Sequence, residues 1–377
     1  MKLSCLQENL NRGLGIVGRA VATRTTLPIT NNVLLATDKG RLKLVATNLE
    51  MAISCWIGAK IEEEGAITVP ARLLTEFVSS LPSDTIEASL SPQTKTFGLK
   101  CARFEARISG VDAKDFPPIP SVDEGINTKV EVDFLRQGIN QVVFAAATEE
   151  SRPVLTGVFA QFEGDSVTLA AADGFRLAVY KLPISGTVSE KTEVIIPARA
   201  LSELNRLMAE QEEAVEITLN PGKSQVLFRL KNTELVSQLV QGTFPNYAQL
   251  IPQSYNTRVI VSVTDFLRAT KTASIFARDG SGIVRLMITP GGEAVPGKLT
   301  VSARSEEIGD DVGEIDATVE GDEAKIAFNG KYLNDVLSVL QETQVSLETT
   351  NPSSPGLIRP VGKDNYTHVV MPMFVQW

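Results

Sequence analysis

Histidine, cysteine and aromatic residues are scarce in this chain of 377 residues. Its single histidine, His368, argues against a Ser–His–Asp hydrolase and against a histidine-rich metal site. The three cysteines, Cys5, Cys55 and Cys101, are far apart and show no C-x-x-C spacing. An odd number of isolated cysteines is typical of buried thiols in a reducing cytosol, not of a disulfide or zinc framework.

Long hydrophobic runs are also lacking. No apolar run reaches the ~18 residues of a membrane span, and residues 1–20 lack a signal-peptide layout. The 45 acidic residues outnumber the 36 Lys and Arg, and the net charge of −9 excludes a globally basic coat for nucleic acid, although it allows a local basic surface. Because 43% of the residues are hydrophobic, we expect a folded, cytoplasmic protein of two or three domains.

The chain contains a segment that occurs three times. Residues 67–77, 194–204 and 326–336 each combine a β-type apolar triplet with the start of a helix. In each copy a cation is followed by a leucine and then by an acid; the cations are Arg72, Arg199 and Lys331. A common strand–helix junction is the alternative interpretation. The near-constant spacing of 127 and 132 residues favours an internal repeat.

A second pattern repeats in the same register. Leu10, Leu135 and Leu267 open amphipathic stretches, and Gly13 and Gly138 recur three residues after the first two, at helical spacing. Short β-rich runs follow at 32–36, 41–46, 158–162 and 167–171, separated by turn sequences. We therefore predict an α+β protein of three similar domains, 1–121, 128–250 and 251–377, each with two helices packed on antiparallel sheets.

The size of a closed ring can be estimated from such domains. Helices pack ~10 Å apart, so six helices leave too small a hole for duplex DNA, whereas twelve helices from two chains leave ~28 Å. The six expected helices (6–21, 69–81, 132–148, 196–209, 264–278 and 328–342) carry a net charge of +3 and the remainder −12. The alternative interpretation of this charge difference is that the helix surfaces simply carry mixed charge for solubility. A ring of two chains with mildly cationic helices inside would bind DNA without reading its sequence.

The whole chain resembles the bacterial replicative sliding clamps, the beta subunits of DNA polymerase III. The segments that carry the resemblance are Arg24-Thr-Thr-Leu-Pro-Ile29, Asn48-Leu-Glu-Met51, Val69-Pro-Ala-Arg72, Ala172-Asp-Gly-Phe-Arg-Leu177, Phe244-Pro-Asn-Tyr247 and Val369-Val-Met-Pro-Met373. The resemblance implies a head-to-tail homodimer of six domains that encircles double-stranded DNA and tethers the replicative polymerase. It also implies loading by a clamp-loader ATPase and docking of repair and other proteins through short motifs.

The resemblance further implies a peptide pocket between the second and third domains. Its residues would be Leu155, Ala172, Gly174, Phe175, Arg176, Leu177, Pro245, Leu250, Val369, Met371, Pro372 and Met373. Such side chains form an adaptable apolar cleft, and Arg176 would meet polar or acidic groups of the ligand. Two positions depart from the family: Phe175 stands where many relatives have histidine, and Gln249 where a cation is common. The tail Phe374-Val-Gln-Trp377 is longer than usual and could fold over the pocket, extend it or fray.

For DNA, the resemblance implies Arg24, Arg72 and Arg152, to which the internal repeat adds Arg199 and Lys331, and Arg12, Arg136 and Arg268 lie early in the first helices. A solvated surface charge is the alternative for each. For the interface between the two chains of the ring (the ring seam), the resemblance implies that Phe104 and Ile108 of one chain contact Ile275 and Phe276 of the other. The alternative is that these four side chains belong to internal cores.

The first rival function is that of an ATP-dependent enzyme. Gly292-Glu-Ala-Val-Pro-Gly-Lys298 matches a phosphate-binding loop, but Leu299 replaces the Ser or Thr that would hold Mg²⁺, and residues 299–303 read as a strand. We therefore expect a turn between two strands, no catalytic residues, no metal and no cofactor. The second rival is a monomeric three-domain scaffold that binds only proteins, without topological linkage to DNA.

Overall fold

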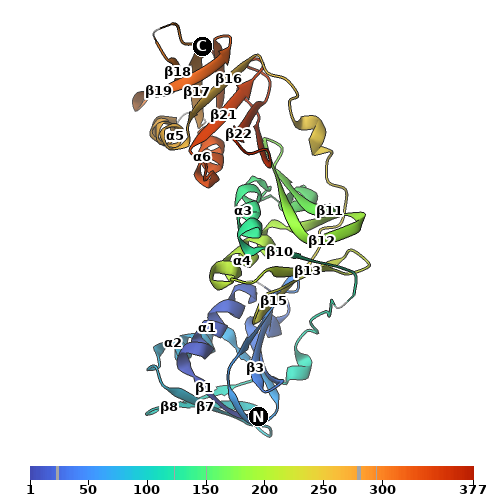
Figure 1. Cartoon of the computed structure of the whole chain (residues 1–377). Coiled ribbons are helices and arrows are strands. Elements are labelled where there is room, and N and C mark those ends of the chain that lie inside the picture. Colours follow the sequence, from blue (N-terminus) through green and yellow to red (C-terminus); the bar gives the residue numbers. More distant parts are fainter. Residues whose placement is uncertain (23–24, 123, 150, 278–281, 294) are drawn as a thin grey trace. The chain divides into compact units, whose positions relative to one another are not determined.

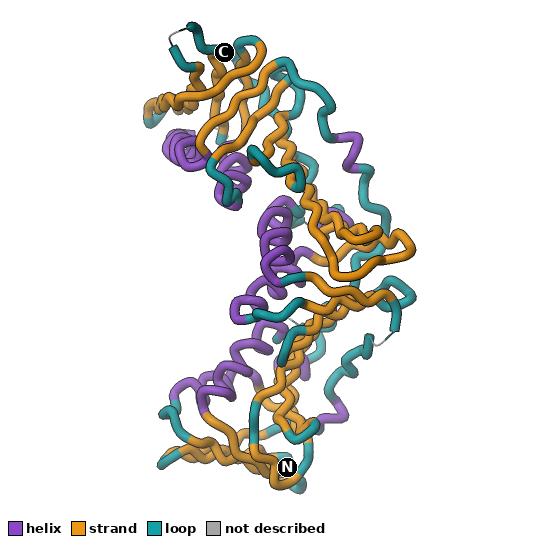
Figure 2. The backbone as a smooth tube through the Cα atoms, in the orientation of Figure 1, coloured by secondary structure: helices purple, strands orange, loops and turns teal. Residues whose placement is uncertain are grey.

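The computed structural model describes residues 1–22, 25–122, 124–149, 151–277, 282–293 and 295–377. These residues form two compact units, residues 1–132 with 199–239 (unit 1) and residues 133–198 with 240–377 (unit 2). The described helices and strands confirm an α+β protein with antiparallel strand pairing (Figures 1 and 2).

Unit 1 is built from two antiparallel sheets and three helices. One sheet has the order β5-β1-β7-β8-β9. In the other, β6-β2-β3-β4 continues through β15-β14-β13 to β10. The helices are α1 (Gln7–Val17), α2 (Ala71–Ser80) and α4 (Ala198–Leu207), whose first residue belongs to unit 2. The strands are β1 (Lys2–Leu6), β2 (Asn32–Asp38), β3 (Arg41–Thr47), β4 (Met51–Ile57), β5 (Lys60–Glu63), β6 (Ala66–Pro70), β7 (Thr85–Ser91), β8 (Thr96–Cys101), β9 (Phe104–Ser109), β10 (Ile126–Val130), β13 (Val215–Leu219), β14 (Gln225–Arg229) and β15 (Thr233–Gln238).

Unit 2 places one long antiparallel sheet beside its helices. The strand order is β20-β17-β18-β19-β16-β21-β22-β23-β12-β11. Helices α5 and α6 lie side by side, and α5 packs on β18 and β19 (Figure 1). The helices are α3 (Val132–Val142), α5 (Val263–Ala277) and α6 (Gly330–Val339); the strands are β11 (Gly157–Ala172), β12 (Arg176–Pro197), β16 (Thr257–Ser262), β17 (Ile283–Thr289), β18 (Gly297–Ser305), β19 (Gly309–Gly321), β20 (Ala324–Asn329), β21 (Gln344–Thr349), β22 (Gly356–Pro360) and β23 (Tyr366–Val370).

The strand-to-helix junction predicted from the repeat occurs in all three copies: β6 runs into α2, β12 into α4 and β20 into α6. In the third copy the Asn329 side chain caps the helix, because its Oδ1 accepts a hydrogen bond from the Lys331 backbone N at 2.9 Å. The second pattern is confirmed for the first two copies, where Leu10 and Leu135 are buried. In the third copy the register was wrong by one residue, since Phe266 is fully buried and Leu267 only half-buried.

The recurring glycines have a packing reason. A Cβ atom on Gly13 would lie 2.6 Å from Leu44 Cδ1, and one on Gly138 would lie 2.9 Å from Leu182 Cδ2. Side chains at these positions would push the helices away from the sheets beneath them. The glycines therefore allow helix α1 to approach β3, and α3 to approach β12.

The structure differs from the sequence-based expectation at the first strand of each repeat and in β11, and agrees with it at the phosphate-loop match. Each repeat opens with a strand that the sequence analysis did not predict (β1, β10 and β16). The runs at 158–162 and 167–171, expected as two strands, form one strand, β11, with irregular pairing around Gly164. The phosphate-loop match lies at the β17–β18 connection, where Thr289 pairs with Lys298, so the predicted turn is confirmed for its described residues. Ala294 of that match lies outside the described residues.

All three cysteines are buried free thiols, as expected. Burial raises the pKa of the Cys5 thiol to about 12. In the part of the chain that the structure describes, no helix is long and apolar enough to cross a membrane.

Candidate functional site

A cleft in unit 2 lies next to the paired strands β12 and β23. It has a volume of about 570 Å³ and is here named the C cleft. Its walls come from four segments: the β11–β12 loop, the connector before β16, the β21–β22 loop and the end of β23. Its lining residues are Ala172, Gly174, Phe175, Arg176, Leu177, Gln249, Leu250, Ile251, Pro252, Gln253, Ser254, Thr350, Ser354, Pro355, Val369 and Met371.

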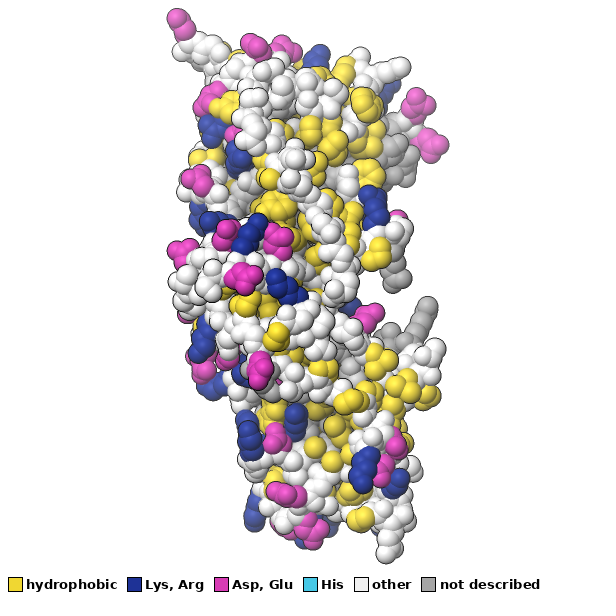
Figure 3. Space-filling model, turned by 90° about the vertical axis from the view of Figure 1, so that its right-hand side faces the viewer, with side chains coloured by type: hydrophobic (Ala, Val, Ile, Leu, Met, Phe, Trp, Pro, Cys, Tyr) yellow, Lys and Arg dark blue, Asp and Glu magenta, His cyan; other side chains and the backbone are white. Residues whose placement is uncertain are grey.

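The floor of the C cleft belongs to a hydrophobic core. Leu177 and Val369 are opposite each other in the β12–β23 pairing, and both are buried with Leu155 and Leu357. The rim is different, because Phe175 and Leu250 are more than half exposed, at 57% and 53%. A rigid apolar floor with exposed hydrophobic side chains around it suits an apolar ligand group. Hydrophobic side chains gather in the upper part of the face that Figure 3 shows.

The β11–β12 loop is held by a compact set of hydrogen bonds. Asp173 Oδ1 accepts from the backbone N of Phe175 at 2.9 Å and of Arg176 at 3.1 Å. Gly174 adopts a φ of +94°, which glycine takes without strain. The Phe175 carbonyl accepts from the Met371 backbone N at 2.8 Å, so the loop is also joined to the end of β23.

Arg176 is a buried tie between the loop and its neighbours. Its Nε donates to Asp173 at 3.0 Å, Nη1 to Asp335 of α6 at 2.6 Å and Nη2 to the Phe144 carbonyl at 2.7 Å. The guanidinium also lies 4.5 Å from the Tyr332 ring centre. Its charge is already balanced by two carboxylates, and it positions the loop. Contact between Arg176 and polar or acidic groups of a ligand stays a prediction.

Eight of the twelve predicted pocket residues line the C cleft together: Ala172, Gly174, Phe175, Arg176, Leu177, Leu250, Val369 and Met371. Leu155 lies in the core below them, and Pro245, Pro372 and Met373 are not among the lining residues. The cleft also contains residues that were not predicted from the sequence: the connector residues 251–254 and the β21–β22 residues Thr350, Ser354 and Pro355. The proline-containing connector beside an apolar cluster could have indicated residues 251–254 as part of the site. The β21–β22 residues come next to the cleft only through strand pairing, which the local sequence does not indicate.

The two unusual positions and the tail have distinct environments. The Phe175 ring stacks on Tyr332 with centroids 6.4 Å apart, and Gln249 lines the cleft. The tail continues beyond the cleft, since the Met373 backbone N donates to the Ala327 carbonyl at 2.7 Å. Phe374 and Trp377 are exposed and do not line the C cleft.

His368 lies beneath the C cleft on β23 and is completely buried. Its ring is 5.5 Å from that of Phe144, and Nδ1 is 3.4 Å from the Tyr366 hydroxyl. Burial lowers the pKa of His368 to about 3, with the nearby positive charge of Arg176 as the second cause. The histidine is therefore neutral near pH 7 and acts as a packing residue.

Seven of the eight predicted DNA-binding cations fall on described residues, and six of them are distributed one to each helix. They are Arg12 on α1, Arg72 on α2, Arg136 on α3, Arg199 on α4, Arg268 on α5 and Lys331 on α6. Arg152 precedes a short 3-10 helix at Pro153–Thr156, and Arg24 lies outside the described residues. Arg12, Arg72, Arg136 and Arg268 each form a salt bridge with an acid. Among the described residues, Arg199 and Lys331 form none within 4.0 Å.

The predicted seam residues divide into exposed and buried ones. Phe104 on β9 and Ile275 on α5 are each 54% exposed, and Phe276 is half-buried. Ile108 is buried in unit 1 opposite Phe97, so the internal-core alternative holds for this side chain.

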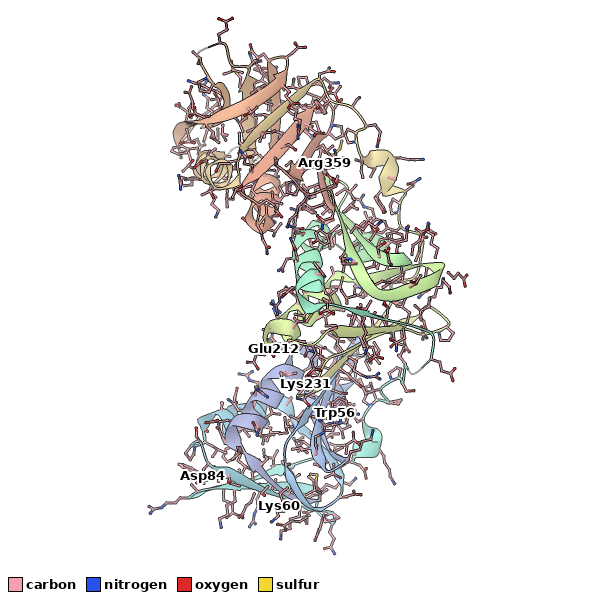
Figure 4. All side chains as sticks on the ribbon, in the orientation of Figure 1. Trp56, Lys60, Asp84, Glu212, Lys231 and Arg359 are labelled. Atoms are coloured by element: carbon pink, nitrogen blue, oxygen red, sulfur yellow. The ribbon has the colours of Figure 1, made fainter. Side chains whose placement is uncertain are left out.

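A polar hollow of about 400 Å³ in unit 1 is a weaker candidate. It is lined by Trp56 and Lys231, which come from neighbouring elements (Figure 4). Two of its three cations have acidic partners: Arg12 pairs with Glu210, and Lys231 with Glu213. The third, Arg41, donates to Asn232 Oδ1 at 3.1 Å. Such pairing leaves little charge for a ligand.

Fold and cleft together define a class of protein: a chain of repeated domains in which helices pack on sheets. Neighbouring repeats are joined by antiparallel strand pairing, between β4 and β15 in unit 1 and between β12 and β23 in unit 2. Family models for the N-terminal, central and C-terminal domains of the DNA polymerase III beta subunit match residues 1–120, 129–246 and 248–374. The chain therefore belongs to the bacterial DNA polymerase III beta subunit family, the beta sliding clamps.

Individual relatives cover the chain almost completely. The beta sliding clamp of Synechocystis sp. is 34% identical over 99% of both chains, and that of Bacillus subtilis is 31% identical over 99% of both. The crystal structure of the Bacillus subtilis clamp matches with a TM-score of 0.94, 30% identity and full coverage of both chains. A Pseudomonas aeruginosa clamp bound to griselimycin matches with a TM-score of 0.92, 29% identity and full coverage of both chains.

Proposed function

We propose that this chain is the DNA replication processivity factor of its cell: two copies close into a ring around duplex DNA, slide without sequence preference and hold the replicative polymerase through the C cleft. The proposal includes three domains at 1–121, 128–250 and 251–377, a cytoplasmic location, loading by a partner ATPase and no catalytic activity of its own. Family membership over the whole chain supports it, and the monomeric scaffold is not favoured.

The observation that carries the DNA part of the proposal is a cation at the second position of α2, α4 and α6. Each junction helix places Arg72, Arg199 or Lys331 in its first turn. A cation there opposes the helix macrodipole and so does not serve helix stability. All three side chains are exposed, and an exposed cation can meet a phosphate of the DNA backbone. Three such cations per chain would hold the DNA backbone without reading bases.

The ring part of the proposal rests on unlike charges at two strands. Strand β9 ends its sheet and carries the exposed Phe104 together with Arg107, which pairs with Glu105 at 3.3 Å. The exposed Arg103 lies just before the strand. Strand β19 carries Asp310 and Asp311 and pairs with β18. Both internal repeat junctions are strand pairings, so we infer a third junction of the same kind between β9 of one chain and β19 of the other, with Ile275 near the seam.

The C cleft would take an apolar segment of a partner, and its exposed Phe175, Leu250 and Met371 would be covered on binding. Since a Pseudomonas aeruginosa relative binds griselimycin, we take this compound as a probe of the cleft in this chain.

The dimer is tested by sedimentation velocity. The expected mass is about 81 kDa, twice the 40.7 kDa of one chain. Replacing Phe104→Glu puts a charge into the seam and is expected to shift the protein to the monomer. Phe134→Glu, at another exposed phenylalanine (44%), is the matched control and should stay dimeric. A wild-type protein that sediments as a 41 kDa monomer at micromolar concentration would contradict the ring.

A further inference from the structure

A second cleft in unit 1 repeats the architecture of the C cleft. It has a volume of about 280 Å³, is here named the N cleft, and is lined by the β3–β4 loop and β4 start (residues 47 and 49–52), the connector 117–120 and three residues of β14 and β15. No part of the proposed function uses it.

The loops of the two clefts share their hydrogen bonds. Asn48 Oδ1 accepts from the backbone N of Glu50 at 3.1 Å and of Met51 at 2.9 Å, as Asp173 does in the C cleft. Leu49 has a φ of +76° and Gly174 one of +94°. A non-glycine residue rarely adopts this conformation, so the loop shape at Leu49 is kept against a steric cost.

The strands beneath the loops share their register as well. Ala52 is opposite Val236 in the N cleft, as Leu177 is opposite Val369 in the C cleft. The Gln238 backbone N donates to the Glu50 carbonyl at 2.8 Å, and the Met371 backbone N donates to the Phe175 carbonyl at the same distance. In the N cleft, Ile119 of the connector packs against the buried cluster of Val122, Leu227 and Val236.

The walls of the N cleft differ from those of the C cleft in charge and stiffness. Glu50 is exposed and is the only charged residue among those that line it. In the described part of the chain Glu50 forms no salt bridge. Three of the four connector residues are prolines, which fix the backbone and keep the wall formed before a ligand arrives.

We propose that the N cleft is a second docking site, for an extended peptide segment of a partner protein that carries a lysine or arginine beside an apolar side chain. The apolar side chain would cover Ile119 and Val236, and the cation would face Glu50. The inference takes from the proposed function only the idea that such a cleft accepts a peptide. With one exposed large hydrophobic residue, Leu49, it should bind more weakly than the C cleft.

The test uses the full-length protein labelled with ¹³C at isoleucine methyl groups. Ile119 reports on the N cleft and Ile251 on the C cleft in the same spectrum. The probes are N-acetyl-Lys-Leu-Phe-amide and its charge-reversed partner N-acetyl-Glu-Leu-Phe-amide. We expect the lysine peptide to shift Ile119 in a saturable way, with about threefold tighter binding than the glutamate peptide, as for an exposed ion pair.

Replacing Glu50→Lys should invert this preference, while Glu64→Lys, the same charge change at an exposed residue outside the cleft, should leave it unchanged. A shift at Ile251 without one at Ile119 would overturn the second site and leave the proposed function intact. A shift of Ile119 that follows protein concentration without peptide would mean that a second copy fills the cleft, and would also overturn the inference. Saturable shifts at Ile119 with the inverted preference would support it, whatever Ile251 does.

Discussion

The loops of the N cleft and the C cleft share their hydrogen bonds and strand register but carry different side chains. Where the C cleft has Arg176, Leu177 and His368, the N cleft has Met51, Ala52 and Leu235 at the corresponding register positions. The C cleft thus carries buried charge and a buried imidazole that the N cleft replaces with apolar groups. One loop geometry, duplicated along the chain, therefore carries different side chains in the two clefts.

The largest difference is expected at Arg176. Replacing Arg176→Met gives the C-cleft loop the residue that the N cleft has, but leaves Asp173 and Asp335 without their cation. Breaking such a buried pair should lower the free energy of unfolding of unit 2 by about 3 kcal/mol. Urea unfolding measures this. The control is Lys271→Met, at an exposed residue of α5 in unit 2, which should change the free energy of unfolding by no more than about 0.5 kcal/mol. An Arg176→Met protein as stable as the control would mean that the tie is not needed.

A smaller difference is expected in the pH dependence. The pKa of His368 is about 3 in the folded protein, below its usual value of 6.5, so the unfolded chain takes up a proton first as the pH falls. The stability that neutral His368 supplies is complete above pH 6.5 and decreases below it, by about 2 kcal/mol between pH 7 and pH 5.

Hydrogen exchange can follow this effect in each unit separately. Protection of the β23 amides, corrected for intrinsic exchange, should fall about 30-fold between pH 7 and pH 5, while β15 amides, next to Leu235, should not show this loss. Replacing His368→Leu should remove the pH dependence from β23. Equal losses in β15 and β23 would assign the acid sensitivity to other groups.

The smallest difference concerns the rim. Replacing Leu250→Ser removes an exposed hydrophobic side chain from the C cleft and should weaken griselimycin binding about tenfold, as expected when one partly buried large side chain is lost. Leu49→Ser makes the same type of change in the N cleft and should leave the affinity unchanged. Calorimetric titration of both variants decides which cleft the compound occupies, and a loss only in Leu49→Ser would reverse the assignment.

Much of this fold was predictable because the internal repeat shows up as patterns between residues that are close in the sequence. The spacing of Leu10, Leu14 and Val17 predicts the buried face of α1, and the cation–leucine–acid pattern after Pro70 and Pro197 predicts the start of α2 and α4. The opening strands β1, β10 and β16 escaped because each is short and leads directly, or after a single residue, into a helix. Leu267 misled the alignment because it follows the buried Phe266 by one position.

The candidate site was predictable only in part, because a cleft depends on contacts between distant segments. Leu177 and Val369 could be placed together through the family resemblance, and the β12–β23 pairing brings them opposite each other. The tie from Arg176 to Asp335 joins residues 159 positions apart and leaves no local pattern in the sequence. The N cleft escaped for the same reason, although Asn48 and Asp173 begin similar loops.

The proposed function requires that two chains close into a ring, and topological linkage to DNA tests this closure directly. The protein is loaded on nicked circular DNA with a clamp-loader ATPase, isolated with the circle at high salt, and the circle is then cut once. We predict that the protein stays on the closed circle in salt that screens its phosphate contacts and leaves through the free ends after cutting. Protein that washes off the uncut circle, or that stays bound equally after linearisation, would contradict a grip based on ring closure.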